Sequence, residues 1–178
     1  MKYGAFLPHL GPLAQRDALT RIKTTAQTAE ALGFDSVWVA DHIITPRQIA
    51  SRYPYSHNGS FPLDPRAPLL EPLSVLSFVA ACTQTIRLGT AVLVLPYRNA
   101  IVTAKTLATL DVLSAGRLIC GVGVGWMEEE FEILNTPFSE RGPLSEESIA
   151  VLKELWTNEN PSFSGRFHQF DDVGCEPR

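Results

Sequence analysis

Residues 86–126 constrain the possible fold more strongly than any other part of the chain. The first of them, residues 86–95, are apolar at both odd and even positions, which is typical of a strand buried on both faces of a parallel sheet. Residues 100–114 then carry apolar side chains at helical spacing, and Asn99 stands where a helix N-cap belongs. A second apolar run, residues 117–123, follows at once. A strand, a helix and a strand joined by short turns predict a right-handed βαβ unit.

The same alternation of strand and helix precedes this segment. Residues 2–7 and 36–40 are short apolar runs that predict two more buried strands. Residues 17–32 carry the apolar stripe of an amphipathic helix. Another helix is expected to begin at Glu71 and Pro72, because proline is favoured in a first helical turn.

The residues beyond the βαβ unit predict two helices and a hairpin. Residues 127–134 and 144–156 are the expected helices, with a break at residues 136–142 between them. Residues 162–170 alternate apolar and polar side chains about a Ser-Gly pair, which predicts a β-hairpin.

Residues 43–70 interrupt the regular alternation. They contain five prolines and several aromatic residues, and they show neither a helical nor a strand period. Connections between strands and helices are usually only a few residues long, and longer ordered ones tend to be lids or binding loops. The segment begins directly after a buried strand, which favours a substrate-side role. A plain surface excursion is the alternative.

Four strand–helix units leave two architectures open, a doubly wound sheet and a (β/α)8 barrel. A doubly wound sheet requires a phosphate-binding fingerprint after its first strand. The only glycine-rich run, residues 121–125, comes at the fourth strand and lacks the last glycine of G-x-G-x-x-G. A barrel typically takes about 250 residues. We therefore expect residues 1–178 to form a single α/β domain of (β/α)8 TIM-barrel type, covering the first four units plus the hairpin and truncated at its C-terminal end.

Composition excludes several classes of protein. The net charge of −4 leaves no basic stripe for a nucleic acid. No segment is suited to a signal peptide or to spanning a bilayer, so we expect a cytoplasmic protein without membrane contact. Cys82, Cys120 and Cys175 lie far apart with no metal-binding spacing, which predicts reduced thiols, buried at the first two positions, and no metal site.

Asp41 and His42 are the candidate reactive groups, because barrels carry these groups at the carboxyl ends of their strands. A histidine can pass a proton near neutral pH. Asp41 is expected to orient His42 or to accept a hydrogen bond from a cofactor ring. Without the neighbouring strand and loop, the same dipeptide would predict only a capping aspartate beside a surface histidine.

Other conspicuous residues have structural interpretations. The glycines within residues 121–125 serve either a tight turn or the close approach of a cofactor to the backbone. Residues 128–130, all glutamate, are expected to be solvated caps that complement a helix dipole. Lys105, Asp111 and Arg117 are expected to form ion pairs on the outer layer.

Several longer motifs resemble those of one known family. LGTAVLVLPYRNAIVTAKTLATLDVLSAGRLICGVGVGW is followed by EEEFEILNTPFSERG and a helix that contains LW. Together they closely resemble the bacterial luciferase-like flavin and deazaflavin oxidoreductases. VWVADH and RYPYSHNGSFP resemble more narrowly the branch assigned to coenzyme F420. The resemblance implies a (β/α)8 barrel that binds the cofactor ring at its C-terminal mouth and moves a hydride at the C5 position of the ring.

The resemblance also implies roles for individual residues. Asp41 and His42 match the acid and the histidine beside the ring, and Ala91–Val92 match a pair that many members join by a non-prolyl cis peptide. The segment past the ring edge is matched by Gly121, Gly123 and Gly125.

The substrate is expected beneath the loop of residues 53–61. Trp126 departs from the sugar-phosphate dehydrogenase branch, which has a glutamate there, so a small apolar organic substrate is expected instead. The residues predicted to contact it are His9, Tyr53, Tyr97 and Trp126.

The predicted function is that of an oxidoreductase which transfers a hydride between coenzyme F420 and a small organic substrate. An FMN-dependent monooxygenase is the alternative. The later strands that usually hold the cofactor phosphate are missing, so a flavin-binding protein without turnover and a truncated remnant also stay open. Two unpaired strand edges are an aggregation hazard, which predicts a homodimer or another self-association that covers them.

Overall fold

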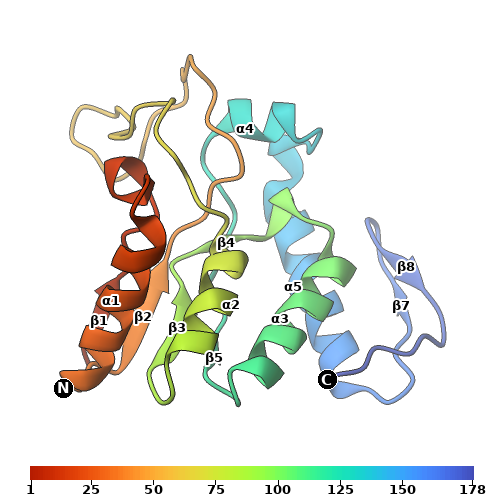
Figure 1. The fold of residues 1–178 in the computed structure, drawn as a ribbon. Helices are drawn as coiled ribbons and strands as arrows, with labels where there is room; N and C mark the ends of the chain where they lie inside the picture. The colour runs from red at the N-terminus through yellow and green to blue at the C-terminus, as the bar shows by residue number, and fades with distance from the viewer.

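A computed structural model describes all 178 residues and shows an α/β fold built on a parallel sheet (Figure 1). The sheet has the strand order β1–β2–β3–β5, and all neighbouring strands run parallel. Two shorter strands continue β3 and β5 along the chain and pair with each other in parallel. The strands are β1 (Gly4–Phe6), β2 (Ser36–Val39), β3 (Arg87–Thr90), β4 (Leu93–Val94), β5 (Leu118–Ile119) and β6 (Val122–Gly123).

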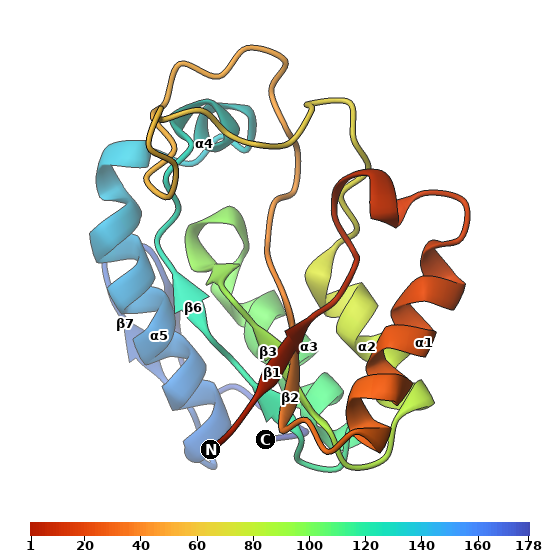
Figure 2. The same cartoon turned by 90° about the vertical axis from the view of Figure 1, so that its left-hand side faces the viewer.

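Four helices lie along one side of the sheet, and a short helix and a long loop gather at one end (Figures 1 and 2). The four are α1 (Ala18–Ala31), α2 (Pro72–Cys82), α3 (Ala100–Leu113) and α5 (Arg141–Thr157). The short helix is α4 (Glu128–Ile133), which lies with the loop of residues 43–70 beyond the carboxyl ends of the strands. A hairpin of β7 (Phe163–Ser164) and β8 (Gln169–Phe170) packs beside α5.

The hydrophobic core lies between the sheet and the helices. One cluster of 13 buried residues joins the sheet to α1 and α2, and it includes the fully buried Val37, Leu76 and Leu88. A second cluster of ten joins α3 to α5 and includes Leu107 and Leu155. The burial of these apolar side chains fixes the helices on one face of the sheet.

The opposite face of the sheet carries no helix. The indole of Trp38 lies across this face, and a Cβ atom at Gly4 or at Gly89 would come within 2.4 Å of it. Glycine at both positions therefore makes room for the indole. Phe6 on β1 leaves 54% of its surface exposed. This uncovered face is bounded by β1 and β5, the two outer strands of the sheet.

The predicted elements are found in place, with differences at their ends. The expected strands at residues 86–95 and 117–123 are each divided in two, and the Ala91–Val92 peptide between β3 and β4 is cis, as the family resemblance implied. A 3-10 turn (Leu95–Tyr97) ends the first of them, because Pro96 has no N–H for a sheet ladder. The hairpin is confirmed.

Helix boundaries follow the local chemistry. Asn99 caps α3, since its side chain accepts hydrogen bonds from the N–H groups of Ile101 and Val102. α5 begins at Arg141, three residues earlier than expected. Pro143 does not prevent this start, because the N–H groups of a first helical turn need no helical partner.

The expected ion pairs on the outer layer are wrong. Arg117 donates to the carbonyl oxygens of Ala80 and Ile86, and the Asp111 carboxylate accepts the N–H of Leu118. These side chains satisfy backbone groups where helices and strands end. Lys105 likewise donates to a backbone carbonyl oxygen near the C-terminus.

Two further findings concern the whole chain. All three cysteines are free, but Cys82 and Cys120 are only partly buried, and Cys175 is the buried one. None of the helices combines the length and the apolar composition that crossing a bilayer requires.

Candidate functional site

The carboxyl ends of the strands, together with the long loop, surround a hollow of about 460 Å³. Most of its lining is hydrophobic, and no lysine or arginine lines it. Such a largely apolar concave site with a few polar groups is typical of small-molecule and cofactor binding. It brings together most of the site residues predicted from the sequence, namely Asp41, His42, Tyr53, Ala91, Val92, Tyr97, Gly123, Gly125 and Trp126.

His42 is held from one side by a carboxylate. Its Nδ1 atom lies 2.6 Å from Oε2 of Glu130, and this is the only hydrogen bond that the imidazole makes within the protein. The rings of Phe61 and Trp126 pack edge-on against it, with centroids 5.1 and 6.2 Å away. The side chain is 10% exposed, and its remaining surface faces the hollow. His42 thus has one fixed nitrogen and one free nitrogen, Nε2.

Glu130 is fully buried, with 0% of its side chain exposed. Its Oε2 atom also accepts the hydroxyl of Tyr97 at 2.9 Å. Its Oε1 atom accepts the N–H groups of Ile43 and Ile44, at 2.7 and 3.1 Å. The expectation that Glu130 is a solvated cap is therefore wrong, because this residue lies on the core side of α4.

The helical period explains why Glu130 is buried. Met127 and Phe131, which are both 0% exposed, are three residues before it and one residue after it. Met127, Glu130 and Phe131 therefore stand at positions i, i+3 and i+4, which together form one face of a helix. Glu130 thus occupies a position in an apolar stripe, and that stripe is the signal by which the sequence distinguishes it from its two glutamate neighbours.

Asp41 is paired with Arg98, a residue that the sequence analysis did not single out. Its Oδ1 atom accepts from Nη2 of Arg98 at 2.9 Å, and its Oδ2 atom accepts the N–H of Val94 at 2.8 Å. Arg98 also reaches Glu71, the N-cap of α2, at 3.1 Å. Burial raises the pKa of Asp41, and the hydrogen bond and charge of Arg98 oppose that shift.

This pairing corrects the role expected for Asp41. The aspartate does not orient His42, since its two oxygens are taken by Arg98 and Val94. Successive residues of an extended chain point in opposite directions, which separates the two side chains. Glu130, 88 residues further along the chain, holds the imidazole instead.

Three aromatic rings close the loop side of the hollow. Tyr53 packs against Trp126 at 5.0 Å and against Phe61 at 5.5 Å between ring centroids, and Phe61 packs against Trp126 at 5.5 Å. Aromatic contacts of this kind stabilise by about 0.5–1.5 kcal/mol each beyond the burial of area. The loop thus reaches the site: Tyr53 lines the hollow together with Trp126, and Phe61 packs behind them against His42.

The same loop is tied to the start of α4. Oε1 of Glu129 accepts the N–H groups of Ala50 and Ser51, at 2.6 and 2.9 Å, and the Ser51 hydroxyl accepts the N–H of Glu128 at 3.0 Å. Burial alone would raise the pKa of Glu129, but hydrogen bonds from backbone N–H groups, including that of Ser51, lower it.

The glycines near the fourth strand are needed for packing. A Cβ atom at Gly121 would lie 2.2 Å from the Thr90 carbonyl oxygen, and one at Gly123 would lie 2.3 Å from Val92. Gly125 has a positive φ of 82°. Gly123 and Gly125 also line the hollow, whereas Gly121 does not.

His9 is the second correction among the predicted site residues. It is fully buried, and it does not line the hollow. Its Nδ1 atom lies 2.9 Å from the Leu7 carbonyl oxygen, and its Nε2 atom lies 3.0 Å from backbone atoms of Ala40. The imidazole therefore links the segments that follow β1 and β2, and it has no surface in the hollow where the substrate is expected.

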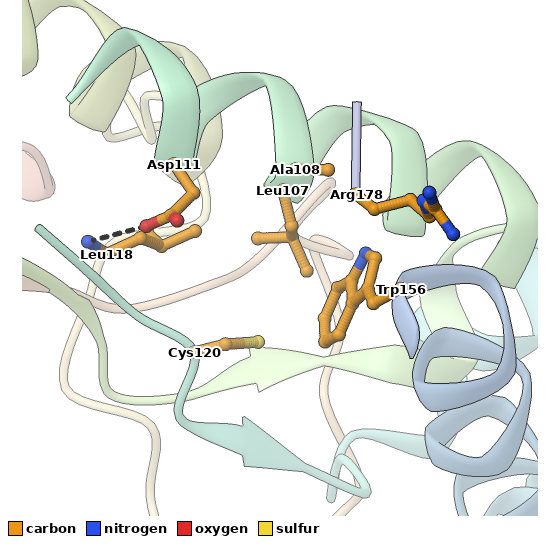
Figure 3. A pocket seen from close by; sticks show the side chains of 7 residues that line it. All are labelled: Leu107, Ala108, Asp111, Leu118, Cys120, Trp156 and Arg178. Carbon is orange, nitrogen blue, oxygen red and sulfur yellow. Dashed lines mark hydrogen bonds between the residues drawn. The ribbon is translucent and has the colours of Figure 1, made fainter. Parts of the chain in front are cut away.

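A second hollow, of about 310 Å³, lies between α3, β5 and α5 (Figure 3). Its polar groups already have partners: Asp111 accepts from the Leu118 N–H, and the Trp156 indole donates to the Ala104 carbonyl oxygen. Burial raises the pKa of the Cys120 thiol at its floor, which keeps that thiol protonated. This hollow carries no group poised for reaction.

The first hollow fits a flat conjugated ring. Val92 exposes 42% of its surface there, and Gly123 beside it presents no side chain, so the two form a low apolar wall. Nε2 of His42 is available to a ring or a substrate. With no lysine or arginine in the lining, the hollow suits the ring of a cofactor better than its phosphate.

The comparisons with known proteins agree with this geometry. The chain is 36% identical over 152 residues to an F420-dependent glucose-6-phosphate dehydrogenase of Amycolatopsis mediterranei, an alignment that covers 83% of this chain and 41% of that protein. The chain spans about half the length of the curated relatives it matches.

Solved structures show the same fold. A monooxygenase from Streptomyces bottropensis superposes with a TM-score of 0.76 and 26% identity, covering 100% of this chain and 50% of that one. The oxygenating constituent of 3,6-diketocamphane monooxygenase from Pseudomonas putida, in complex with FMN, superposes with a TM-score of 0.74 and 16% identity, covering 97% and 44%. The sheet and helices are thus similar to those of luciferase-like TIM-barrel proteins.

The model of one family matches the chain from end to end. That model is described as luciferase-like monooxygenase, and it matches residues 1–178. With the fold, the rim hollow and a relative above 30% identity, this match is decisive. The chain belongs to the luciferase-like monooxygenase family.

Proposed function

We propose that the chain forms the ring-binding half of an F420-dependent oxidoreductase which transfers a hydride between coenzyme F420 and a small organic substrate. The observation that carries this proposal is the position of His42. Its Nδ1 is held by Glu130, and Nε2 faces an apolar hollow beside Ala91 and Val92. The F420-dependent relative supports the choice of cofactor.

Bound F420 would supply a hydride donor or acceptor in this hollow. The residues of the chain would do the rest. Ala91, Val92 and Gly123 would support the ring on their apolar wall. Nε2 of His42 would give a proton to the substrate oxygen as the hydride reaches carbon, and would take it back in the reverse direction. Tyr53, Phe61 and Trp126 would keep water away from the reacting atoms.

The lining indicates the class of substrate. The hollow has no lysine or arginine to pair with a phosphate, and its only carboxylate, Asp41, is already paired with Arg98. A charged substrate would lose hydration without gaining a partner. A small, uncharged and largely apolar alcohol or carbonyl compound fits the aromatic wall best.

An FMN-dependent monooxygenase is the second candidate function. The hollow would accept a flavin ring on the same wall, and both structural neighbours reported above are monooxygenases, one of them in complex with FMN. Equilibrium titration of the protein with F420 and with FMN, followed by the absorbance of each, separates the two functions. Uptake of neither cofactor would contradict both and favour a non-catalytic remnant.

The test of the His42 assignment is the variant His42→Ala. Loss of the proton-transferring group is expected to lower kcat by about 10²- to 10⁴-fold. Cofactor affinity, measured by the same titration, is expected to stay near that of the unmodified protein. His57→Ala is the matched control, because His57 is an exposed histidine of the same loop that does not line the hollow. Unchanged turnover of His42→Ala, with the cofactor bound, would refute the assignment.

We further propose that the domain is an incomplete barrel. The uncovered sheet face and the outer strands β1 and β5 support this, because a barrel strand is paired on both sides and its inner face is filled by side chains. Self-association that covers these edges, in a homodimer or a larger assembly, follows from the same observation.

A further inference from the structure

We propose that Glu130 is a positioning residue which fixes the tautomer of His42. Neutral His42 would carry its proton on Nδ1 and present an unprotonated Nε2 to the hollow. The tautomer follows from the contacts of Glu130 alone. Its consequence for turnover rests on the proposed function of His42.

Four donors surround the carboxylate of Glu130. Each oxygen of Glu130 receives two groups: Oε1 receives the N–H groups of Ile43 and Ile44, and Oε2 receives the Tyr97 hydroxyl and Nδ1 of His42. The distances lie between 2.6 and 3.1 Å. An ionised carboxylate has about four acceptor sites, and in the fully buried Glu130 all four are occupied by these groups, which leaves no place for a carboxyl hydrogen.

Apart from His42, the three partners of Glu130 can act only as hydrogen-bond donors. A backbone N–H has no lone pair and can only donate. Burial and the charge of Glu130 raise the pKa of Tyr97 far above its usual range, so the hydroxyl keeps its proton and donates. An ionised carboxylate has no hydrogen to give, so Nδ1 of His42 must be a donor as well. In neutral His42 the proton is therefore on Nδ1, and Nε2 is bare.

Glu129 shows that a carboxylate can anchor the loop without contacting His42. Glu129, the preceding residue, also accepts two backbone N–H groups of the loop, those of Ala50 and Ser51. It touches no group of the hollow. Two adjacent carboxylates thus anchor the same loop, and only Glu130 also bonds a ring that faces the hollow. Loop anchoring alone does not require that second bond.

The decisive variant is Glu130→Gln, which keeps the shape of the side chain and replaces one oxygen by an NH₂ group. The neighbouring groups dictate the orientation of the glutamine amide, because the N–H groups of Ile43 and Ile44 need an acceptor. The amide oxygen must therefore face them, and the NH₂ group must face Tyr97 and His42. Nδ1 would then accept a hydrogen bond, and the proton would move to Nε2.

The tautomer is measured by two-bond ¹H–¹⁵N correlation spectra of ¹⁵N-histidine-labelled protein, without cofactor, at a pH where the ring is neutral. We expect the Nδ1–H form in the unmodified protein, the Nε2–H form in Glu130→Gln, and no change in the matched control Glu129→Gln. An Nε2–H form in the unmodified protein would overturn the proposal, and this result does not depend on whether the variant folds. An unchanged tautomer in folded Glu130→Gln would also overturn it.

Turnover supplies the second measurement. In the direction of alcohol oxidation Nε2 must be bare to accept the proton, and the inverted tautomer already carries one there, so Glu130→Gln should lower kcat in that direction by about 10²- to 10⁴-fold, as removal of the imidazole does. Glu129→Gln should turn over as the unmodified protein does. If the tautomer inverts while His42→Ala itself costs no turnover, the positioning role stands and the proposed function of His42 fails.

Discussion

Arg98 decides whether Asp41 can exist as a buried charge. The Asp41 side chain is 0% exposed, that of Arg98 is 13% exposed, and a two-pronged contact joins them. Removing one partner of a buried pair leaves the other charge without compensation, which costs far more than the pair contributes while intact.

Arg98→Ala is therefore expected to lower the free energy of unfolding by about 3–5 kcal/mol. Urea denaturation followed by circular dichroism measures this loss, and the midpoint should fall without a change of slope. Arg16→Ala, at an exposed arginine with no salt bridge, is the control. An equal stability of the two variants would show that Asp41 is protonated or rehydrated at little cost.

Among the elements, α1 shows how one side chain organises a whole turn. Glu30, near the end of α1, accepts the N–H groups of Gln84, Thr85 and Ile86, which connect α2 to β3. Burial raises the pKa of Glu30, but these three hydrogen bonds outweigh that effect and lower the pKa to about 2. The Glu30 carboxylate thus serves as the acceptor for three N–H groups that have no backbone acceptor within the turn.

This lowered pKa predicts an acid-dependent stability. Because the folded pKa is below the ordinary value of 4.5, the contribution of Glu30 is complete above pH 4.5 and is lost as the pH falls towards 2. Glu30→Ala should lower the free energy of unfolding by about 1–3 kcal/mol at neutral pH, since it removes the charged acceptor of the three N–H groups.

Urea titrations at several pH values between 2 and 7 measure the effect, and the difference between Glu30→Ala and the unmodified protein should shrink as the pH falls. Glu159→Ala, at an exposed glutamate with no hydrogen bond, should follow the unmodified protein throughout. A difference that stays constant with pH would contradict a role for the ionised carboxylate.

The sequence allowed most of these elements to be predicted, because their signals are local. Apolar periodicity located the strands and helices, and Asn99 marked the start of α3. The rim residues Asp41 and His42 could be found because they end a buried strand. Glu130 could not be assigned from its type, since a run of three glutamates is usually solvated. Only its place in the stripe with Met127 and Phe131 distinguishes it.

Local sequence patterns do not predict contacts between segments that lie far apart in the chain. The partner of Asp41 is 57 residues away, and that of His42 is 88 residues away. Both contacts form because the fold brings the carboxyl ends of the strands close together. No local pattern in the sequence gives that distance. His9 was misplaced for the same reason, because its position after β1 predicts the rim but not the backbone groups that enclose it.

At the scale of the whole molecule, the two faces of the sheet differ in whether helices cover them. Helices bury one face, whereas Phe6 and other side chains of the opposite face stay exposed. Exposed strand edges next to an apolar face favour association. Sedimentation velocity over a range of concentrations should therefore show species of at least twice the chain mass of 19.6 kDa.

Phe6→Lys tests where this association occurs. A charge at the open edge of the uncovered face is expected to return the protein to the mass of a single chain. Leu19→Lys is the matched control, since Leu19 is a similarly exposed apolar residue, 64% accessible, on α1 of the helical layer. A single-chain mass for the unmodified protein at every concentration would rule out the assembly.

Trp38 packs across the strands that carry Gly4 and Gly89, so its fluorescence reports on the environment of the open sheet face. Its indole is half-buried on the open face and donates to the Ser36 hydroxyl at 2.8 Å. Any surface that covers that face would exclude water from the indole and shift its emission to the blue. The emission of Trp126 would instead respond to a ligand that enters the hollow at the strand ends. Two of the three tryptophans would thus register two events, assembly and ligand entry, in one unlabelled chain.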